Sequence, residues 1–325
     1  MVRPLRVKPP KKQLPKEKQG VSPLLWYGGK QSIADWIVGH LPPHNTYVEL
    51  FGGGGSVIFR KLPSKLDIYN DIGNATNFFR VLRNHGEELY EKLYYTPYGR
   101  QEFYSCRTRW KELSDLYINK LQLSFEDEIE WARCWFVTLT QGYAHEESTK
   151  SPWKPSKTND LAFSWTNRVE DLTRFTERLR GIVLESVDFD RAIDMYDSPV
   201  TLFYADPPYT EGSRVTQNNY VHEMPRDQHL LLLKKLKSIK GQAMVSMYDD
   251  PVYNRELADW RCDTITHVSG VQNAKSMADG RGNRTEKLWL KEHHYGLWTP
   301  FPTTPPDVSR EAELTGAEQQ TSPLV

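Results

Sequence analysis

The chain has 325 residues, enough for two cooperating domains of about 150 residues each and a large core. With 38% hydrophobic and 26% charged residues, its composition is typical of a globular protein and excludes a fibrous or wholly disordered chain. Its longest apolar runs are far too short to span a membrane, so we expect a cytoplasmic protein without a membrane partner. Cys106, Cys134 and Cys262 lie far apart and without ligand spacing. We therefore expect three buried small residues, with neither a disulfide framework nor a metal site.

Charge is balanced over the whole chain but unevenly distributed. The 42 basic and 42 acidic side chains give no net charge, so the total indicates no polyanionic partner. Residues 1–20 hold seven basic side chains against one acidic one, whereas residues 299–325 hold one basic side chain against four acidic ones. Both segments are rich in proline and lack periodic apolar positions, which predicts two flexible tails, the first of them basic.

Strand and helix patterns alternate through most of the remaining chain. Short apolar runs rich in β-branched and aromatic residues predict strands, and amphipathic runs between them predict helices. Such alternation is typical of the α/β class, with a mostly parallel sheet covered by helices. The predicted strands are 47–50, 66–69, 182–187, 200–205, 243–247, 264–268 and 287–290, and the predicted helices include 56–61, 74–84 and 227–237.

The alternation is interrupted between about residues 86 and 180, where the pattern becomes helical or irregular. Seventeen of these 95 residues are aromatic, a higher density than the 12% of the whole chain. We therefore predict a mostly helical domain, 86–180, inserted between two sheet-forming parts, 21–85 and 181–298.

A glycine run follows the first predicted strand and precedes the first predicted helix, in the segment Glu49-Leu-Phe-Gly-Gly-Gly-Gly-Ser56. Glycines let the backbone approach a ligand at a helix N-terminus. The segment lacks the Lys-Ser/Thr of a phosphate loop and the spacing of a dinucleotide fingerprint. A ligand-binding loop and an ordinary tight turn are therefore equally favoured at this point.

Asp71 comes directly after the second predicted strand. An acidic side chain at this place in an α/β unit is positioned to accept both ribose hydroxyls of a nucleoside-type cofactor. The alternative is that Asp71 or Asn74 caps the helix that follows. Both interpretations place the residue at the edge of the sheet where ligands bind.

The segment Asp206-Pro-Pro-Tyr209 follows another predicted strand, at the carboxyl end where open α/β sheets bind ligands. Its two prolines fix the backbone and remove N–H donors, so Asp206 and the carbonyl of Pro207 are free to act as acceptors. Tyr209 adds a flat aromatic face. Two acceptors beside an aromatic plane suit an exocyclic amino group on a stacked base.

Together these motifs resemble those of the Dam-type DNA adenine methyltransferases, over about residues 24–290. The resemblance implies a Rossmann-like methyltransferase sheet with an inserted, mostly helical DNA-recognition domain. It also implies transfer of a methyl group from S-adenosylmethionine to adenine N6 in double-stranded DNA, after the adenine has been flipped out of the duplex. The residues that carry the resemblance are, in chain order, Trp26-Tyr-Gly-Gly-Lys30, Glu49-Leu-Phe-Gly-Gly-Gly-Gly-Ser-Val57, Tyr69-Asn-Asp71, Val187-Asp-Phe189 and Asp206-Pro-Pro-Tyr209.

The same resemblance implies a role for each motif residue and no metal. Outside the family, the ordinary interpretations are core aromatics at Trp26 and Phe189, a solvated helix start at Lys30 and a turn at Asp188. The implied catalytic residues are Asp206, Pro207, Tyr209 and Lys30, and the implied cofactor-binding residues are Trp26, Lys30, Phe51, Gly53, Gly55, Asp71, Asp188, Phe189 and Asp206.

Two polar loops are candidates for DNA contacts. The first, 210–224, carries Arg214 and Asn218, and the second, 270–287, carries Lys275, Arg281 and Arg284. We expect the second to be a mobile stretch between two strands that contacts phosphates, and a solvated loop with incidental charges is the alternative.

The insert departs from the family pattern at Leu139-Thr-Gln-Gly-Tyr-Ala-His-Glu-Glu-Ser148. Members that read GATC carry an Arg-Tyr-Asn stretch followed by Gly-x-Phe-Asn-x-Pro-x-Gly in this region, so we predict a recognition sequence other than GATC. A cytosine N4 methyltransferase and an inactive DNA-binding module with a retained cofactor pocket stay open as alternatives. The sequence leaves the oligomeric state open and does not exclude RNA as the substrate.

Overall fold

The computed structural model describes residues 22–118, 123–143, 151–209, 224–268 and 283–291. The two predicted tails, 1–20 and 299–325, lie outside these ranges. Within them, no helix has the length and hydropathy that crossing a membrane requires.

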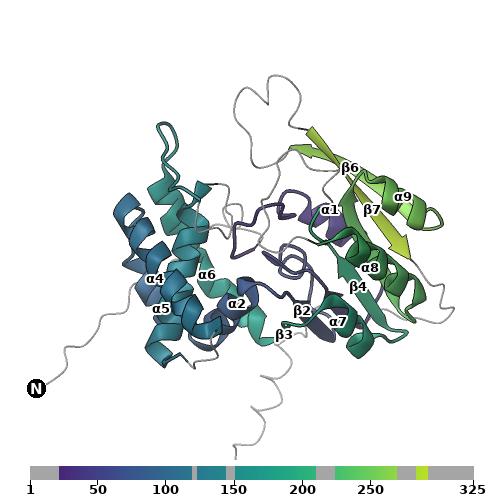
Figure 1. Ribbon diagram of the computed structural model, residues 1–325, viewed down its shortest axis with the longest axis horizontal. Coiled ribbons are helices and arrows are strands. Elements are labelled where there is room, and N and C mark those ends of the chain that lie inside the picture. Colours follow the sequence, from purple (N-terminus) through teal and green to yellow (C-terminus); the bar gives the residue numbers. More distant parts are fainter. Residues whose placement is uncertain (1–21, 119–122, 144–150, 210–223, 269–282, 292–325) are drawn as a thin grey trace, which may run out of the picture. The chain divides into compact units, whose positions relative to one another are not determined.

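The described strands form one mixed sheet, in the order β3-β2-β1-β4-β5-β7-β6 (Figure 1). Strands β1 to β5 are parallel to their neighbours, and β7 runs antiparallel between β5 and β6. Because the chain order reverses between β1 and β4, their carboxyl ends open into a crevice of the kind that binds ligands. The strands are β1 (Thr46–Glu49), β2 (Leu66–Asn70), β3 (Ile182–Glu185), β4 (Thr201–Ala205), β5 (Gln242–Tyr248), β6 (Arg261–Val268) and β7 (Asn283–Lys291).

Side chains alternate between the two faces of the sheet, and both faces are buried. Tyr47 and Tyr204 belong to a core on one face, and Val48 and Phe203 belong to a core on the other. Burial on both faces is expected of parallel strands covered by helices on each side. Helices α1 (Ala34–Gly39) and α2 (Asn74–Asn84) contribute to the first core, and α7 (Phe189–Tyr196), α8 (Arg226–Ser238) and α9 (Pro251–Glu256) to the second.

The α/β fold expected from the sequence is confirmed, and each predicted strand overlaps an observed one. The helix predicted at 56–61 is wrong, because this segment forms successive turns. It begins after Gly55, whose φ of 71° is not helical, and the β-branched Val57 and Ile58 are buried in the core. Pro63 follows so closely that a regular helix has no room to propagate.

The segment predicted as an insert is helical. It contains α3 (Gly86–Tyr94), α4 (Arg100–Ile118), α5 (Phe125–Gln141) and α6 (Leu161–Arg180), which pack against one another and against α2, beside the β3 edge of the sheet (Figure 1). Trp131 stacks on Trp135 with ring centroids 6.0 Å apart, and Phe78 of α2 stacks on Phe136 at 5.3 Å. The aromatic core of these helices is therefore continuous with the core on one face of the sheet.

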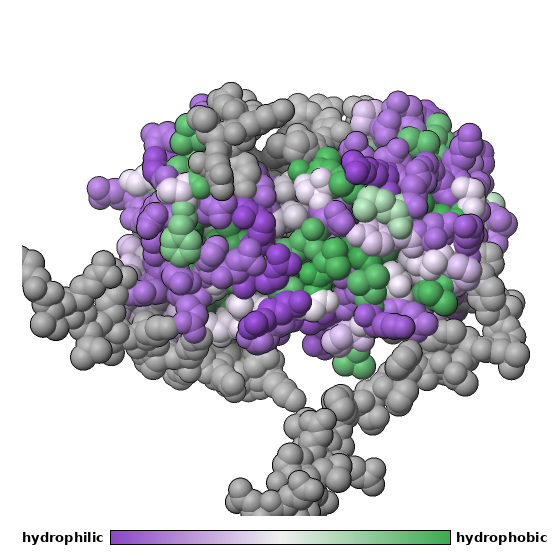
Figure 2. Space-filling model, turned by 90° about the horizontal axis from the view of Figure 1, so that it is seen from below, coloured by the Kyte–Doolittle hydropathy of each residue, from purple (hydrophilic) through white to green (hydrophobic). Residues whose placement is uncertain are grey.

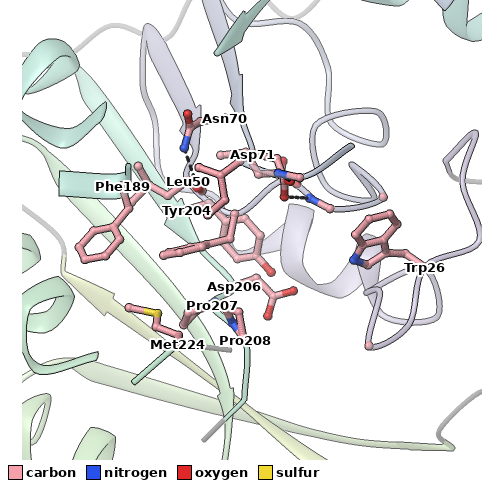
Figure 3. Close-up of a pocket in the computed structure, with 18 of the residues that line it drawn as sticks. Trp26, Leu50, Asn70, Asp71, Phe189, Tyr204, Asp206, Pro207, Pro208 and Met224 are labelled. Carbon is pink, nitrogen blue, oxygen red and sulfur yellow. Dashed lines mark hydrogen bonds between the residues drawn. The ribbon is translucent and has the colours of Figure 1, made fainter. Parts of the chain in front are cut away.

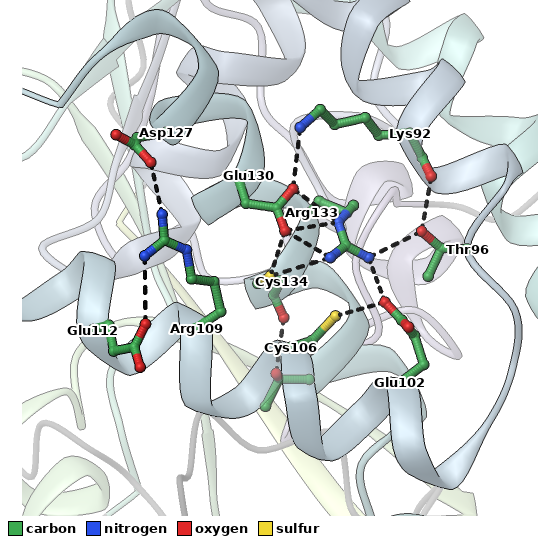
Figure 4. A network of polar contacts seen from close by, with 11 residues as sticks. Lys92, Thr96, Glu102, Cys106, Arg109, Glu112, Asp127, Glu130, Arg133 and Cys134 are labelled. Atoms are coloured by element: carbon green, nitrogen blue, oxygen red, sulfur yellow. Dashed lines mark hydrogen bonds and ion pairs between the residues drawn. The ribbon is translucent and has the colours of Figure 1, made fainter.

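A polar network also joins the helices of this segment (Figure 4). The Arg133 guanidinium donates to Glu102 and to Glu130, at 2.6 Å in each case, and Lys92 pairs with Glu130 at 3.1 Å. These contacts bring α3, α4 and α5 together. Arg133 and Lys92 together lower the pKa of Glu130 to about 2, although its burial acts to raise it.

The three cysteines do not all lie in the interior. Cys106 and Cys134 are buried, as expected, but the expectation that Cys262 is buried is wrong. Cys262 lies on β6, an edge strand of the described sheet, and is exposed. The surface view shows hydrophobic side chains gathered in a central area between more polar regions (Figure 2).

Candidate active site

A cavity of about 360 Å³ lies at the carboxyl ends of β1, β2 and β4. Its walls come from loops that are far apart in the sequence and meet because of the strand order. Trp26 and Phe189 lie on opposite sides of it, with Asp206 between them (Figure 3). The lining segments are 26–30, 49–54, 56–57, 70–73, 187–189, 204, 206–209, 224–225 and 228.

The glycine run forms one wall of this cavity through close packing. Gly53 has a φ of 47°, and a Cβ atom there would lie 2.7 Å from Trp26 Nε1. At Gly52 a Cβ atom would lie 2.0 Å from the Tyr69 ring, whose hydroxyl donates to the Gly53 carbonyl at 2.7 Å. Gly55 is not among the residues that line the cavity. It has a φ of 71°, and a Cβ atom there would lie 2.6 Å from the Phe59 ring. The segment is therefore both a tight turn and a cavity wall.

Asp71 faces the cavity and is held there by backbone amides. Its Oδ2 atom accepts a hydrogen bond from the Gly53 amide at 2.8 Å, and its Oδ1 atom accepts from the Gly73 amide at 2.7 Å. The cap position of α2 is Gly73, so the alternative that Asp71 or Asn74 caps this helix is wrong. Its carboxylate therefore has a fixed orientation in the cavity wall.

Aromatic side chains line both ends of the cavity. Phe51 and Phe189 lie with ring centroids 5.7 Å apart, next to Asp188 at the cap position of α7. At the other end, Trp26 packs on Trp135 of α5 at 6.4 Å. The cavity thus combines flat apolar walls with a few fixed polar groups, which is typical of a small-molecule site.

Lys30, which is buried, and Asp206, which is partly buried, form an ion pair at the centre of the lining. Lys30 Nζ donates to Asp206 Oδ1 at 2.6 Å and to the Tyr209 hydroxyl at 2.7 Å. Ser246 Oγ also donates to Asp206 Oδ1, at 3.0 Å. The ordinary interpretation of Lys30 as a solvated helix start is wrong, because its side chain is only 4% exposed. Burial raises the pKa of Asp206 to about 6, although Lys30 and Ser246 act to lower it.

Tyr209 is covered on one face by a residue that the sequence motifs did not point to. Tyr248, at the end of β5, stacks on it with centroids 4.1 Å apart and ring planes at 7°. Lys30 Nζ is 5.0 Å from the Tyr209 centroid but 2.7 Å from its hydroxyl, so the ammonium lies near the hydroxyl edge. One face of Tyr209 is therefore taken by Tyr248.

Two buried carboxyl groups near this centre were also missed by sequence reasoning. Glu49 lines the cavity, and burial raises its pKa to about 8, although the Tyr47 hydroxyl donates to it at 2.9 Å. Its place at the head of the glycine run was an available signal. Glu286 on β7 lies 3.5 Å from Lys30 Nζ. No motif marks Glu286, because only the pairing of β5 with β7 brings it to the site.

The candidate DNA-contacting residues fall largely outside the described ranges. Arg214, Asn218, Lys275 and Arg281 all do. Arg284 belongs to β7, opposite His267 of β6, so the expectation that it sits in a loop is wrong. The strand begins earlier than predicted because Asn283 to Glu286 pair with β6, a contact that a short apolar run cannot reveal.

Comparison with known proteins assigns the chain to a family. No curated protein matches it significantly. The family model of the D12 class N6 adenine-specific DNA methyltransferases matches residues 26–270, which include every motif that lines the cavity. The cytosine N4 and inactive-module alternatives find no support in this match. A match over most of the chain, with the family's motifs gathered around one cavity, shows that the protein belongs to the D12 class and is an adenine-specific DNA methyltransferase.

Proposed function

We propose that this enzyme takes its methyl group from S-adenosylmethionine and transfers it to N6 of an adenine flipped out of duplex DNA, at a sequence other than GATC. The observation that carries the proposal is the buried cluster of Asp206, Lys30 and Tyr209 in the wall of a cavity that also contains Asp71. One cavity thus provides acceptors for a reacting amino group and acceptors for a ribose.

The cavity fits a nucleoside-type cofactor in size and chemistry. Its volume of about 360 Å³ lies in the range of small-molecule sites. Asp71, fixed by the amides of Gly53 and Gly73, would accept the ribose hydroxyls, and Phe51 and Phe189 would flank the cofactor base. Trp26 would pack at the methionine end. S-adenosylmethionine, when bound, supplies an electrophilic methyl group on a positively charged sulfur.

Asp206 would act as the acceptor for the amino group of the target base. The lone pair of this amino group is delocalised into the ring, so the nitrogen is a poor nucleophile until its hydrogens are drawn toward acceptors. Lys30 and Ser246 both donate to Oδ1, which leaves Oδ2 for the substrate. The Pro207 carbonyl provides a second acceptor in a segment where prolines carry no N–H. An anionic group in a water-poor site also stabilises the positive charge that develops on nitrogen.

The reaction leaves one proton too many on the methylated amino group. Asp206 accepts a hydrogen bond from that nitrogen in this scheme, and its pKa of about 6 makes it a stronger base than an ordinary aspartate. We therefore assign the first acceptance of this proton to Asp206, with solvent as the final acceptor.

The target adenine must leave the duplex to reach Asp206, which costs a few kcal/mol of stacking and pairing. Tyr209 replaces part of the lost stacking. Tyr248 stacks on one face of this ring. This gives Tyr248 the role of a support that keeps the Tyr209 ring in place.

Expression in a host without DNA methylation, followed by sequencing of modified bases, tests the proposal. We expect N6-methyladenine within one recurring sequence that is not GATC. Nucleoside mass spectrometry of the same DNA separates N6-methyladenine from N4-methylcytosine. DNA that stays unmodified while the protein is folded, or that carries N4-methylcytosine, would refute the proposal, and modification confined to GATC would refute its specificity.

A further inference from the structure

The Lys30 ammonium raises an electrostatic difficulty for the proposed reaction. Methyl transfer makes the target nitrogen positive, so the site should present negative charge to it. Lys30 Nζ lies 2.6 Å from Asp206 Oδ1, and its side chain is 4% exposed. Water screens such a pair poorly, so the cation offsets most of the charge of the carboxylate. Lys30 and Asp206 alone would present a nearly neutral pair to the base.

A second carboxylate, that of Glu286 on β7, faces the same ammonium. Glu286 Oε1 lies 3.5 Å from Lys30 Nζ, and the Glu286 side chain is 0% exposed. Among the residues that the structure describes, neither carboxylate oxygen of Glu286 has a hydrogen-bond partner. Burying a charge with so little compensation is unfavourable for stability. The arrangement is therefore better explained by what Glu286 does for Lys30 than by what it adds to the fold.

We propose that Glu286 is a positioning residue that offsets the charge of Lys30, so that the cluster as a whole presents negative charge to the methylated nitrogen. The inference rests on the proposed function. Lys30 contacts two carboxylates, so the three groups carry one net negative charge when both are ionised. When a base amino group approaches Asp206, Lys30 can shift toward Glu286 without losing its ion pair. Glu286 acts through Lys30 and does not touch the base.

Other groups face the cluster from each neighbouring strand. Glu49 of β1 is largely neutral at neutral pH, because burial raises its pKa to about 8. Tyr204 of β4 and Ser246 of β5 are uncharged and hydrogen-bond to each other at 2.9 Å. His267 of β6 has its Nε2 atom 3.9 Å from Glu286 Oε2.

The test compares single-turnover methylation against pH in the wild type, Glu286→Gln and Glu286→Asp. The Gln variant keeps the size of the side chain and removes its charge. We expect its limiting rate to fall about tenfold, less than the hundredfold typical of a group in direct contact with the reacting atoms. The acid limb of the profile is the fall in methylation rate at low pH. We expect this limb to move to lower pH in the Gln variant, because Glu286 helps to raise the pKa of Asp206 to about 6. The Asp variant keeps the charge and should keep the wild-type limb.

The matched control for Glu286→Gln is Asp249→Asn, which also removes one carboxylate charge, at the end of the neighbouring strand β5. Asp249 follows β5, pairs with Lys287 and is 66% exposed, so its charge is screened by water and Asp249→Asn should leave the acid limb in place. Thermal unfolding checks the fold of each variant. If Glu286→Gln is slow but its acid limb does not shift, the role of Glu286 is merely structural and the inference is overturned. An acid limb that shifts in Glu286→Asp, which keeps the charge, would also overturn it. A wild type that methylates no DNA would instead refute the proposed function itself.

Discussion

Lys30 and Asp206 are 176 residues apart in the chain, yet their side chains meet at 2.6 Å in the wall of the cavity. The contact arises because Asp206 follows β4 directly, at the point where the strand order reverses. Lys30 also donates to Tyr209, so one buried ammonium fixes both the acceptor carboxylate and the aromatic ring of the same motif. The sheet topology thus assembles the reaction centre from two distant motifs.

Activity should depend on pH through Asp206. Burial raises its pKa from the ordinary value to about 6, and only the ionised form presents negative charge to the amino group and can take up its proton. The methylation rate should therefore be lost as the pH falls through about 6 and be retained above it. Single-turnover rates across this range, with cofactor and DNA saturating, measure the limb. A rate that stays constant well below this pH would show that Asp206 is not the ionising group.

Asp71→Ala should weaken S-adenosylmethionine binding in the absence of DNA. Each hydrogen bond from a ribose hydroxyl to a carboxylate is worth about 1.5 to 3 kcal/mol at most. The substitution also frees the Gly53 and Gly73 amides, so Asp71→Asn, which keeps one acceptor oxygen, serves as the milder comparison. Titration calorimetry gives the dissociation constants. Unchanged affinity in the Ala variant would remove Asp71 from the cofactor site.

Gly53→Ala should also lower cofactor affinity, for a steric reason. The new Cβ atom would lie 2.7 Å from Trp26 Nε1, at a φ of 47° that costs an alanine about 1 to 3 kcal/mol. Gly39→Ala is the matched control, because a Cβ atom there meets nothing within 4 Å. We expect weaker binding and a lower melting temperature for the first variant only. Equal behaviour of the two variants would contradict the packing argument.

The sequence motifs predicted the site residues that directly follow visible strands. They did not predict the residues that contact those site residues only because two strands pair in the sheet. The glycine run, Asp71 and Asp206 follow strands whose apolar runs are visible in the sequence. Tyr248 and Glu286 are paired with each other across β5 and β7, and each contacts a motif residue for that reason. Such contacts depend on register and strand order, which apolar periodicity does not encode. The same limit explains why Arg284 was expected in a loop.

Deletion of residues 1–20 should weaken DNA binding at low salt and leave the recognition sequence unchanged. The segment has seven basic side chains against one acidic one. Such an arm contacts phosphates, whose contribution falls as salt rises, and does not read base edges. Binding isotherms at several salt concentrations, with sequencing of modified adenines, measure both effects. A changed recognition sequence after deletion would contradict this assignment.

Single-turnover methylation by Asp206→Ala, with binding of cofactor and DNA measured in parallel, tests the account most directly. The variant keeps the glycine wall, Asp71 and the Tyr209 ring, so equilibrium binding should change little. It loses the anionic acceptor in a buried site, and removal of one such preorganised group typically costs about a hundredfold to a thousandfold in rate. We predict a fall of at least that size. A variant within a few-fold of the wild-type rate would show that Asp206 is not the acceptor for the target amino group.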